Sequence, residues 1–130
     1  MSHATIALVI AQPGPLRDSL VTLLSTLPEI EIVAEARDLS TLNRIREDWQ
    51  PDIILLEASC LKNGFREALQ QIGAVWDKSR TMMLVDSIKQ QRLADTAGFD
   101  AAYVKGSQVS CLIDIVQTLL SPERKQTPQQ

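Results

Sequence analysis

Short, mostly apolar segments alternate along the chain with longer amphipathic ones, and the apolar segments predict β-strands. They are four or five residues long, rich in β-branched side chains, and span residues 6–10, 31–34, 53–56, 82–85 and 101–104. Four of them are almost continuously apolar, which is typical of strands buried on both faces of a parallel sheet. Around the second, Ile30 and Ile32 alternate with Glu29 and Glu31, a pattern that indicates an edge strand with one solvated face.

The amphipathic segments carry apolar residues three and four positions apart, which is the spacing of one helix face. They predict five helices, whose apolar stripes lie at residues 16–27, 39–45, 65–72, 88–97 and 112–120. Pro15 suits the first turn of the first helix, and Pro28 ends that helix. Ser107 is a candidate N-cap of the fifth helix, and Gly98 is placed to end the fourth.

A strict alternation of strand and helix, repeated five times, predicts a parallel sheet with helices on both faces and right-handed crossovers. Since the second strand is edge-like and the other four are apolar throughout, the strand order 2-1-3-4-5 is favoured. The sequence therefore predicts an α/β protein of the flavodoxin-like (βα)5 class, with one domain over residues 5–120. Residues 121–130 contain two prolines and no apolar side chain, which predicts a disordered tail or linker stub.

Composition and charge narrow the class of function. The 130 residues suit one domain, and 45% of them are hydrophobic and 22% charged, as in ordinary globular proteins. A net charge of −3 lacks the basic footprint of a nucleic-acid binder, and no apolar run approaches the ~18 residues of a membrane span. Cys60 and Cys111 form neither a disulfide framework nor a zinc-binding pattern. We therefore expect a cytoplasmic protein that contacts neither nucleic acid nor membrane directly.

In open α/β sheets, ligands bind outside the carboxyl ends of the strands, so the residues that follow each strand form the candidate site. The third predicted strand is followed by Glu57, the fourth by Asp86 and Ser87, and the fifth by Lys105. A phosphate-binding loop is not predicted after the first strand, because segment 12–15 contains one glycine and two prolines, which lack N–H donors. One central carboxylate opposite one lysine is a sparse set of charged groups.

Three segments carry a family resemblance: residues 27–36 (LPEIEIVAEA), 50–57 (QPDIILLE) and 97–105 (AGFDAAYVK). They resemble the receiver (CheY-like) domain of bacterial two-component response regulators, closest to receivers that precede LuxR/NarL-type DNA-binding domains. The resemblance covers residues 5–120. It implies signal transduction through a protein partner, either a histidine kinase or an effector. It also implies a homodimer or partner face that runs from strand 4 to helix 5.

The resemblance also implies a phosphorylation site, and its residues differ here. Receivers accept a phosphoryl group on an aspartate at the end of strand 3, where this chain has Glu57. The acidic pair that holds Mg²⁺ at the end of strand 1 corresponds to Gln12 and Pro13, or to Ala11 and Gln12 if the alignment shifts by one residue. None of these side chains is charged. Phosphoryl transfer needs a metal ion to neutralise the transferring group, and Mg²⁺ is usually held by carboxylates. Because these positions hold no carboxylate, we expect the chain to bind no cofactor, Mg²⁺ included.

The positions that contact the phosphoryl group or respond to it in receivers differ as well, with one exception. Lys105 keeps the lysine that follows strand 5. The Ser or Thr at the end of strand 4 corresponds to Val85, with Ser87 two residues later. The switch aromatic, three residues before the lysine, corresponds to Ala102, with Tyr103 displaced by one residue.

These departures predict a pseudo-receiver, a module without catalytic residues that signals through protein contacts. Extending the acceptor carboxylate by one methylene disturbs the in-line geometry, and a misplacement of about 1 Å costs roughly 10²-fold in rate. Glu57 is interpreted as a carboxylate paired with Lys105; the alternative is a permanent substitute for a phosphorylated aspartate. An alternative function is a working phosphoacceptor receiver of a phosphorelay, in which Glu57, Asp86 or Ser87 takes part.

Overall fold

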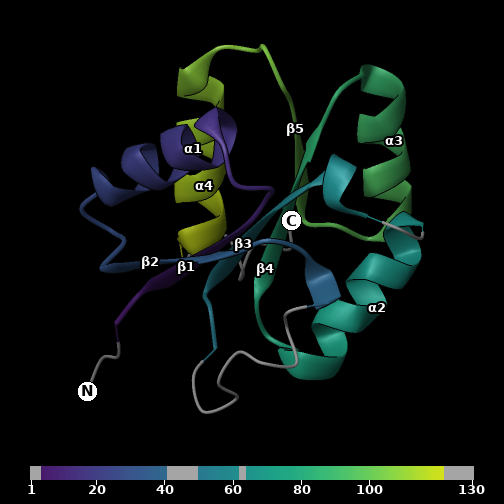
Figure 1. The fold of residues 1–130 in the computed structure, drawn as a ribbon, viewed down its shortest axis with the longest axis horizontal. Helices are drawn as coiled ribbons and strands as arrows, with labels where there is room; N and C mark the ends of the chain where they lie inside the picture. Colours follow the sequence, from purple (N-terminus) through teal and green to yellow (C-terminus); the bar gives the residue numbers. More distant parts are fainter. Residues whose placement is uncertain (1–3, 41–49, 62–63, 122–130) are drawn as a thin grey trace, which may run out of the picture.

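The sheet contains five parallel strands in the order β2-β1-β3-β4-β5 (Figure 1). The computed structural model describes residues 4–40, 50–61 and 64–121 of the chain. The strands are β1 Ile6–Ile10, β2 Ile32–Ala36, β3 Ile53–Glu57, β4 Arg80–Val85 and β5 Ala101–Val104. The predicted flavodoxin-like order is confirmed, and β2 lies at an edge of the sheet as expected.

Helices cover both faces of the sheet (Figure 1). α1 Pro15–Ser25 and α4 Val109–Leu120 pack on one face, whereas α2 Phe65–Val75 and α3 Ile88–Ala97 pack on the other. A short 3-10 helix, η2 Ala58–Cys60, follows β3 directly. The sheet is therefore the middle layer of three.

Two of the sequence predictions fall on residues that the structure does not describe. The predicted helix with its apolar stripe at 39–45 falls mostly within residues 41–49, and the predicted tail falls within 122–130 apart from its first residue. Both stay predictions, as does the domain boundary near residue 120.

Alternate residues of the central strands enter two separate cores, one on each face of the sheet. In β3, Ile54 and Leu56 pack toward α2 and α3, whereas Ile53 and Leu55 pack toward α1 and α4. All four side chains are fully buried. This double burial explains why the central strands read as continuous apolar runs.

Three strands differ from their predicted bounds, and β3 differs only because it includes Glu57, one residue past the predicted end. The prediction of 31–34 for β2 was wrong at both ends, because the strand begins at Ile32 and its five residues pair with the five residues of β1. Ile30 is buried ahead of the strand and Ile32 is 48% exposed, so the alternation of Ile and Glu does not mark a buried strand face. β4 starts earlier than the predicted 82–85, because Arg80 already pairs with β3.

α1 ends at Ser25, two residues before the predicted end. The backbone N–H of Leu27 donates to the carbonyl of Leu24 at 3.1 Å, so the chain tightens into a three-residue turn there. The Thr26 hydroxyl donates to the Leu23 carbonyl at 2.6 Å and occupies an acceptor of the last helical turn. Leu27 stays buried outside the helix, which is why its apolar character looked helical in the sequence.

α4 begins at Val109, and the prediction that Ser107 caps this helix was wrong. The N–H of Ser107 donates to the carbonyl of Val104 at 3.1 Å, and its own carbonyl accepts a hydrogen bond from the Tyr103 hydroxyl. Ser107 is therefore part of the turn after β5. Gln108 holds the N-cap position, without a capping side-chain hydrogen bond.

α3 has the start and end that the sequence predicts. The hydroxyl oxygen of Ser87 accepts a hydrogen bond from the N–H of Gln90 at 3.2 Å and caps the first turn. Gly98 ends the helix with φ 111°, a left-handed conformation that favours glycine.

Candidate functional site

Three charged side chains meet at the carboxyl end of the sheet, and each comes from a different strand end. Glu57 is the last residue of β3, Asp86 follows β4, and Lys105 follows β5. These three strands are neighbours in the sheet, so their ends bring the side chains together. The Lys105 ammonium donates to Glu57 Oε2 at 2.5 Å and lies 3.1 Å from Asp86 Oδ1. One cation thus links the ends of three adjacent strands.

The two carboxylates at Lys105 differ in exposure. The side chain of Glu57 is 11% exposed and that of Asp86 is 60% exposed. Because water screens the exposed pair more strongly, the Lys105–Glu57 pair is the stronger of the two. Burial alone would lower the pKa of Lys105, but the hydrogen bonds and charges of Glu57 and Asp86 outweigh it and raise that pKa above its ordinary value. Lys105 is therefore cationic throughout the neutral range.

The residues that follow β1 supply no carboxylate to this site. Gln12 and Pro13 are exposed residues of the loop between β1 and α1. The charged side chain at this strand end is Arg17, whose Nη1 donates to the carbonyl of Ala11 at 3.4 Å and whose Nε lies 3.1 Å from Glu35 Oε1. Among the residues that the structure describes, no group of three or more His, Cys, Asp or Glu side chains could hold a metal ion.

The end of β4 supplies no hydroxyl from the strand itself. Val85 is fully buried in the core beside α2 and α3. Ser87 lies beyond the strand, where its hydroxyl oxygen serves as the N-cap acceptor of α3. The hydroxyl nearest in sequence to the Val85 position is therefore already engaged in holding the helix start.

Ala102 and Tyr103 are neighbours on β5 and enter opposite cores. Ala102 lies in the core beside α2 and α3, and Tyr103 lies in the core beside α1 and α4. The Tyr103 hydroxyl donates to the carbonyl of Ser107 and lies 3.3 Å from that of Gln108. Burial and the nearby Cys111 raise the pKa of Tyr103. A displacement of one residue thus moves the aromatic ring to the other face of the sheet.

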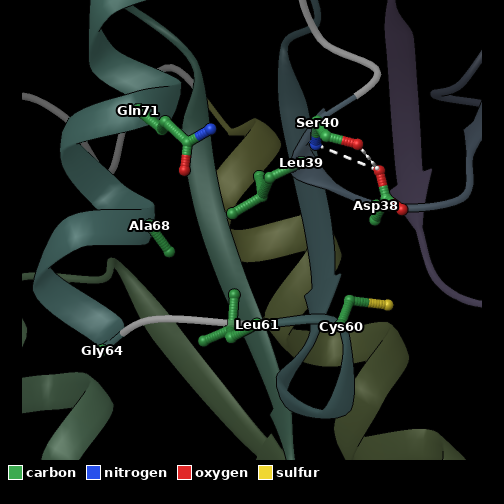
Figure 2. Close-up of a pocket in the computed structure, with 8 residues that line it drawn as sticks. All are labelled: Asp38, Leu39, Ser40, Cys60, Leu61, Gly64, Ala68 and Gln71. Atoms are coloured by element: carbon green, nitrogen blue, oxygen red, sulfur yellow. Dashed lines mark hydrogen bonds between the residues drawn. The ribbon is translucent and has the colours of Figure 1, made fainter.

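A small cavity of about 110 Å³ lies beside this site, between the loop after β2, η2 and the start of α2 (Figure 2). The Asp38 carboxylate accepts hydrogen bonds from the N–H and the hydroxyl of Ser40 at its rim, at 3.0 and 2.6 Å. The thiol of Cys60 points away from α2 and lies 3.5 Å from the carbonyl of Arg37 (Figure 2). The cavity is smaller than the ~300–1,000 Å³ of ordinary ligand pockets.

Burial, and next the charge of Glu57, raise the pKa of Cys60. The thiol is itself buried and engaged with backbone carbonyls. A protonated, buried thiol is a weak nucleophile, so this cysteine adds no reactive group to the strand ends.

The contact between Lys105 and Asp86 was missed at the level of sequence. The sequence places both residues at strand ends, yet it pairs Lys105 with Glu57 alone. The strand order holds the missing signal, because β4 lies between β3 and β5, and a lysine after β5 must pass the end of β4 to reach β3.

No protein-family model matches the sequence, and no curated protein sequence matches it. Solved structures, in contrast, are similar to this chain. A two-component response regulator of the LuxR family from Aurantimonas sp. SI85-9A1 is 25% identical, with a TM-score of 0.75 over 96% of this chain and 94% of that one. A LuxR family DNA-binding response regulator from Silicibacter pomeroyi is 21% identical, with a TM-score of 0.73 over 89% and 91% of the two chains.

A third similar structure comes from the complex of the CheA3 P1 domain with CheY6 from R. sphaeroides. It is 19% identical, with a TM-score of 0.75 over 92% of this chain and 98% of that one. The structural neighbours of this chain are thus response-regulator receiver domains, and their fold is the fold seen here.

The resemblance implies a dimer or partner face that runs from strand 4 to the fifth predicted helix, which is α4 in the structure. This face from β4 to α4 stays a prediction. Two apolar side chains on α3 are well exposed near it, Ile88 at 60% and Leu93 at 52%. Within the described part of the chain, no helix is long and apolar enough to cross a membrane.

Proposed function

We propose that this chain is a pseudo-receiver, a signalling module of the two-component type that acts through protein contacts without being phosphorylated. One observation carries the proposal: the Lys105 ammonium lies between Glu57 and Asp86, at 2.5 and 3.1 Å from their oxygens. Both carboxylates at the receiver-like strand ends are therefore already paired with a cation that belongs to the chain.

The first support is the poor fit of this site to Mg²⁺. Mg²⁺ needs near-octahedral oxygen coordination at about 2.0–2.1 Å and is usually held by one or two carboxylates with substrate oxygens. Glu57 and Asp86 are the carboxylates at hand, and a metal ion would compete with Lys105 for both. Gln12 and Pro13 stand where receivers have the acidic pair that supplies further carboxylate ligands. The residues present therefore do not suit the ion.

The second support is the acceptor itself. Glu57 is longer than aspartate by one methylene, and its Oε2 is held by Lys105. In-line attack on a phosphoryl donor requires the acceptor oxygen within a narrow range of positions, and about 1 Å of misplacement costs roughly 10²-fold in rate. The carboxylate is thus both displaced and occupied.

The third support concerns Glu57 as a substitute for a phosphorylated aspartate. Such a role requires an element that responds to the added charge. In receivers a switch aromatic responds, and the corresponding position in this chain is Ala102. Tyr103 enters the opposite core and is tied to the backbone of the turn after β5. We therefore propose that Glu57 is a structural partner of Lys105, and not a mimic of the active state.

In this proposal the partner is a protein, either a histidine kinase or an effector. The R. sphaeroides complex of CheY6 with the CheA3 P1 domain, whose structure resembles that of this chain, is one precedent for such a contact. No catalytic residue is assigned, and a homodimer through the face from β4 to α4 is part of the same proposal.

The test is the intact mass of the protein after incubation with acetyl phosphate and Mg²⁺, beside a conventional receiver as positive control. We expect no phosphoryl adduct. A stoichiometric adduct would overturn the proposal in favour of a working phosphoacceptor, and peptide mapping would show whether Glu57, Asp86 or Ser87 carries it.

Two variants separate the acceptor from the metal site. Glu57→Asp alone should also remain unmodified, because Gln12 and Pro13 still supply no carboxylate. The triple variant Glu57→Asp, Gln12→Asp and Pro13→Asp restores the acidic set. If the triple variant is phosphorylated and the single variant is not, the natural chain fails to react because it does not bind the metal ion. Labelling of the single variant would show that the missing acidic pair is not what prevents the reaction.

A further inference from the structure

A second, larger cavity lies between α1, α4 and the turn after β5, next to the charged site. Its volume is about 460 Å³, and it is lined mostly by apolar side chains, among them Leu16 and Leu23 of α1 and Val109 and Leu112 of α4. Lys105 and Tyr103 also line it. The size falls within the ~300–1,000 Å³ of small-molecule pockets, which are largely apolar with a few polar groups.

The charges around the cavity disfavour an anion. Lys105 is the cation that lines it, and its ammonium is already paired with Glu57 and Asp86, so the three groups together carry one negative charge in excess. The Tyr103 hydroxyl donates to a backbone carbonyl. An anionic ligand would therefore meet no unpaired cation among the described lining residues and would be repelled by the excess charge.

We propose that the cavity between α1 and α4 binds a neutral, largely apolar small molecule. Such a ligand contacts Lys105 and Tyr103, which line the cavity. This inference deepens the proposed function, since it gives a module that is not phosphorylated a chemical input at the same strand ends. Its failure and the failure of the phosphorylation proposal are read by separate measurements, a dye titration and an intact mass.

A pair of related dyes tests the proposal. N-phenyl-1-naphthylamine is neutral and apolar, and 1-anilinonaphthalene-8-sulfonate adds a sulfonate to the same framework. We expect saturable binding of the neutral dye to the folded chain with one site, and at least roughly tenfold weaker binding of the sulfonate, or about 1.4 kcal/mol. Absence of saturable binding of the neutral dye would overturn the proposal, and equal or tighter binding of the sulfonate would overturn the neutral class of ligand.

Two matched variants locate the dye. Val109 and Ile88 are the first residues of α4 and α3, they are 55% and 60% exposed, and only Val109 lines the cavity. Glutamate at a helix start is favoured by the helix dipole, so both Val109→Glu and Ile88→Glu should fold. We expect Val109→Glu to weaken binding of the neutral dye by roughly fivefold or more, about 1 kcal/mol, and Ile88→Glu to leave it unchanged.

Equal effects of the two variants would overturn this location. A second copy of the chain is the alternative occupant of the cavity. Sedimentation of the chain at the dye-titration concentration tests this alternative, because it measures the oligomeric state. A dimer that Val109→Glu dissociates and the neutral dye does not would assign the cavity to an interface and overturn the small-molecule proposal. A monomer that binds one neutral dye per chain would support it.

Discussion

The two ends of the sheet use acidic residues in different ways. At the amino end, Asp52 Oδ2 accepts a hydrogen bond from the N–H of Ile6 at 2.8 Å, and Asp100 Oδ2 accepts one from the N–H of Thr81 at 2.8 Å. At the carboxyl end, Glu57 and Asp86 share the Lys105 ammonium instead. The first pair of acids accepts hydrogen bonds from strand backbone, although Asp100 also lies 3.9 Å from Arg80 Nη1, and the second pair contacts a side chain.

This difference separates stability from function within one sheet. An acceptor removed from the amino end leaves a buried backbone N–H without its hydrogen bond, which costs the full desolvation penalty of that group. At the carboxyl end the backbone is not the donor, so the side chains there are free to change partners without loss of a strand. Ligands of open α/β sheets bind outside this end of the strands.

The largest effect is therefore expected at the amino end, from Asp100→Ala. Thr81 is 4% exposed, and the substitution removes the carboxylate that accepts hydrogen bonds from its N–H and its hydroxyl. We expect the free energy of unfolding to fall by about 2 kcal/mol, measured by urea denaturation.

Asp95→Ala serves as the control for Asp100→Ala. Asp95 is an exposed residue of α3, and its substitution should change the unfolding free energy by less than about 0.5 kcal/mol. Asp100→Asn keeps an oxygen acceptor and should recover most of the loss. If Asp100→Ala is as mild as its control, the amino end does not stabilise the sheet in this way.

The next effect is expected at the carboxyl end, from Lys105→Met. This substitution leaves Glu57, whose side chain is 11% exposed, without its cation, and we expect a loss of about 1–2 kcal/mol in unfolding free energy. Lys89→Met on the exposed surface of α3 is the matched control. The double variant Lys105→Met with Glu57→Met should regain stability, because it removes the unpaired carboxylate as well. A single-variant loss larger than that of Asp100→Ala would reverse the comparison of the two ends.

The sequence predicts the fold well because the fold depends on burial. The apolar run at residues 53–56 has to be covered on both faces, and that requirement favours a parallel sheet with helices on each side. Helix ends such as Leu27 and turns such as that of Ser107 depend on single hydrogen bonds, which leave no periodic signal. The predicted bounds were wrong at these two places and at ends of β2, β3 and β4.

The candidate site is predictable to the level of strand ends and no further. Glu57 and Lys105 are readable because each directly follows an apolar run, and parallel strands end at one edge. The contact of Lys105 with Asp86 depends on which strand lies between, and the position of Tyr103 depends on the parity of one residue along β5. The cavity between α1 and α4 depends on how two distant helices pack, which no local pattern contains.

A pH dependence sharpens the account of the carboxyl end. The pKa of Lys105 is raised in the folded chain, so its stabilising contribution is complete below the ordinary lysine value of about 10.4 and is lost as pH rises through the folded pKa. The difference in unfolding free energy between the natural chain and Lys105→Met should therefore be constant below about pH 10 and shrink as the pH rises above the ordinary lysine value. Urea midpoints at several pH values measure it, and Tyr103 is present in both chains, so its titration largely cancels. A constant difference would show that Lys105 stabilises by packing and not by charge.

The smallest effect is expected from Asp86→Asn, and it tests which carboxylate is the main partner of Lys105. The Asp86 side chain is 60% exposed, and exposed ion pairs typically contribute below about 1 kcal/mol, so we expect a loss under about 0.5 kcal/mol. Screening at about 1 M salt should remove that loss, whereas the larger loss from Glu57→Gln should persist, because Glu57 is shielded from the solvent. Asp95→Asn controls for the general effect of removing a surface charge. If Asp86→Asn costs as much as Glu57→Gln, Lys105 is held mainly at the end of β4, and the centre of the site moves from the receiver-like acceptor position to a strand end that the resemblance does not assign.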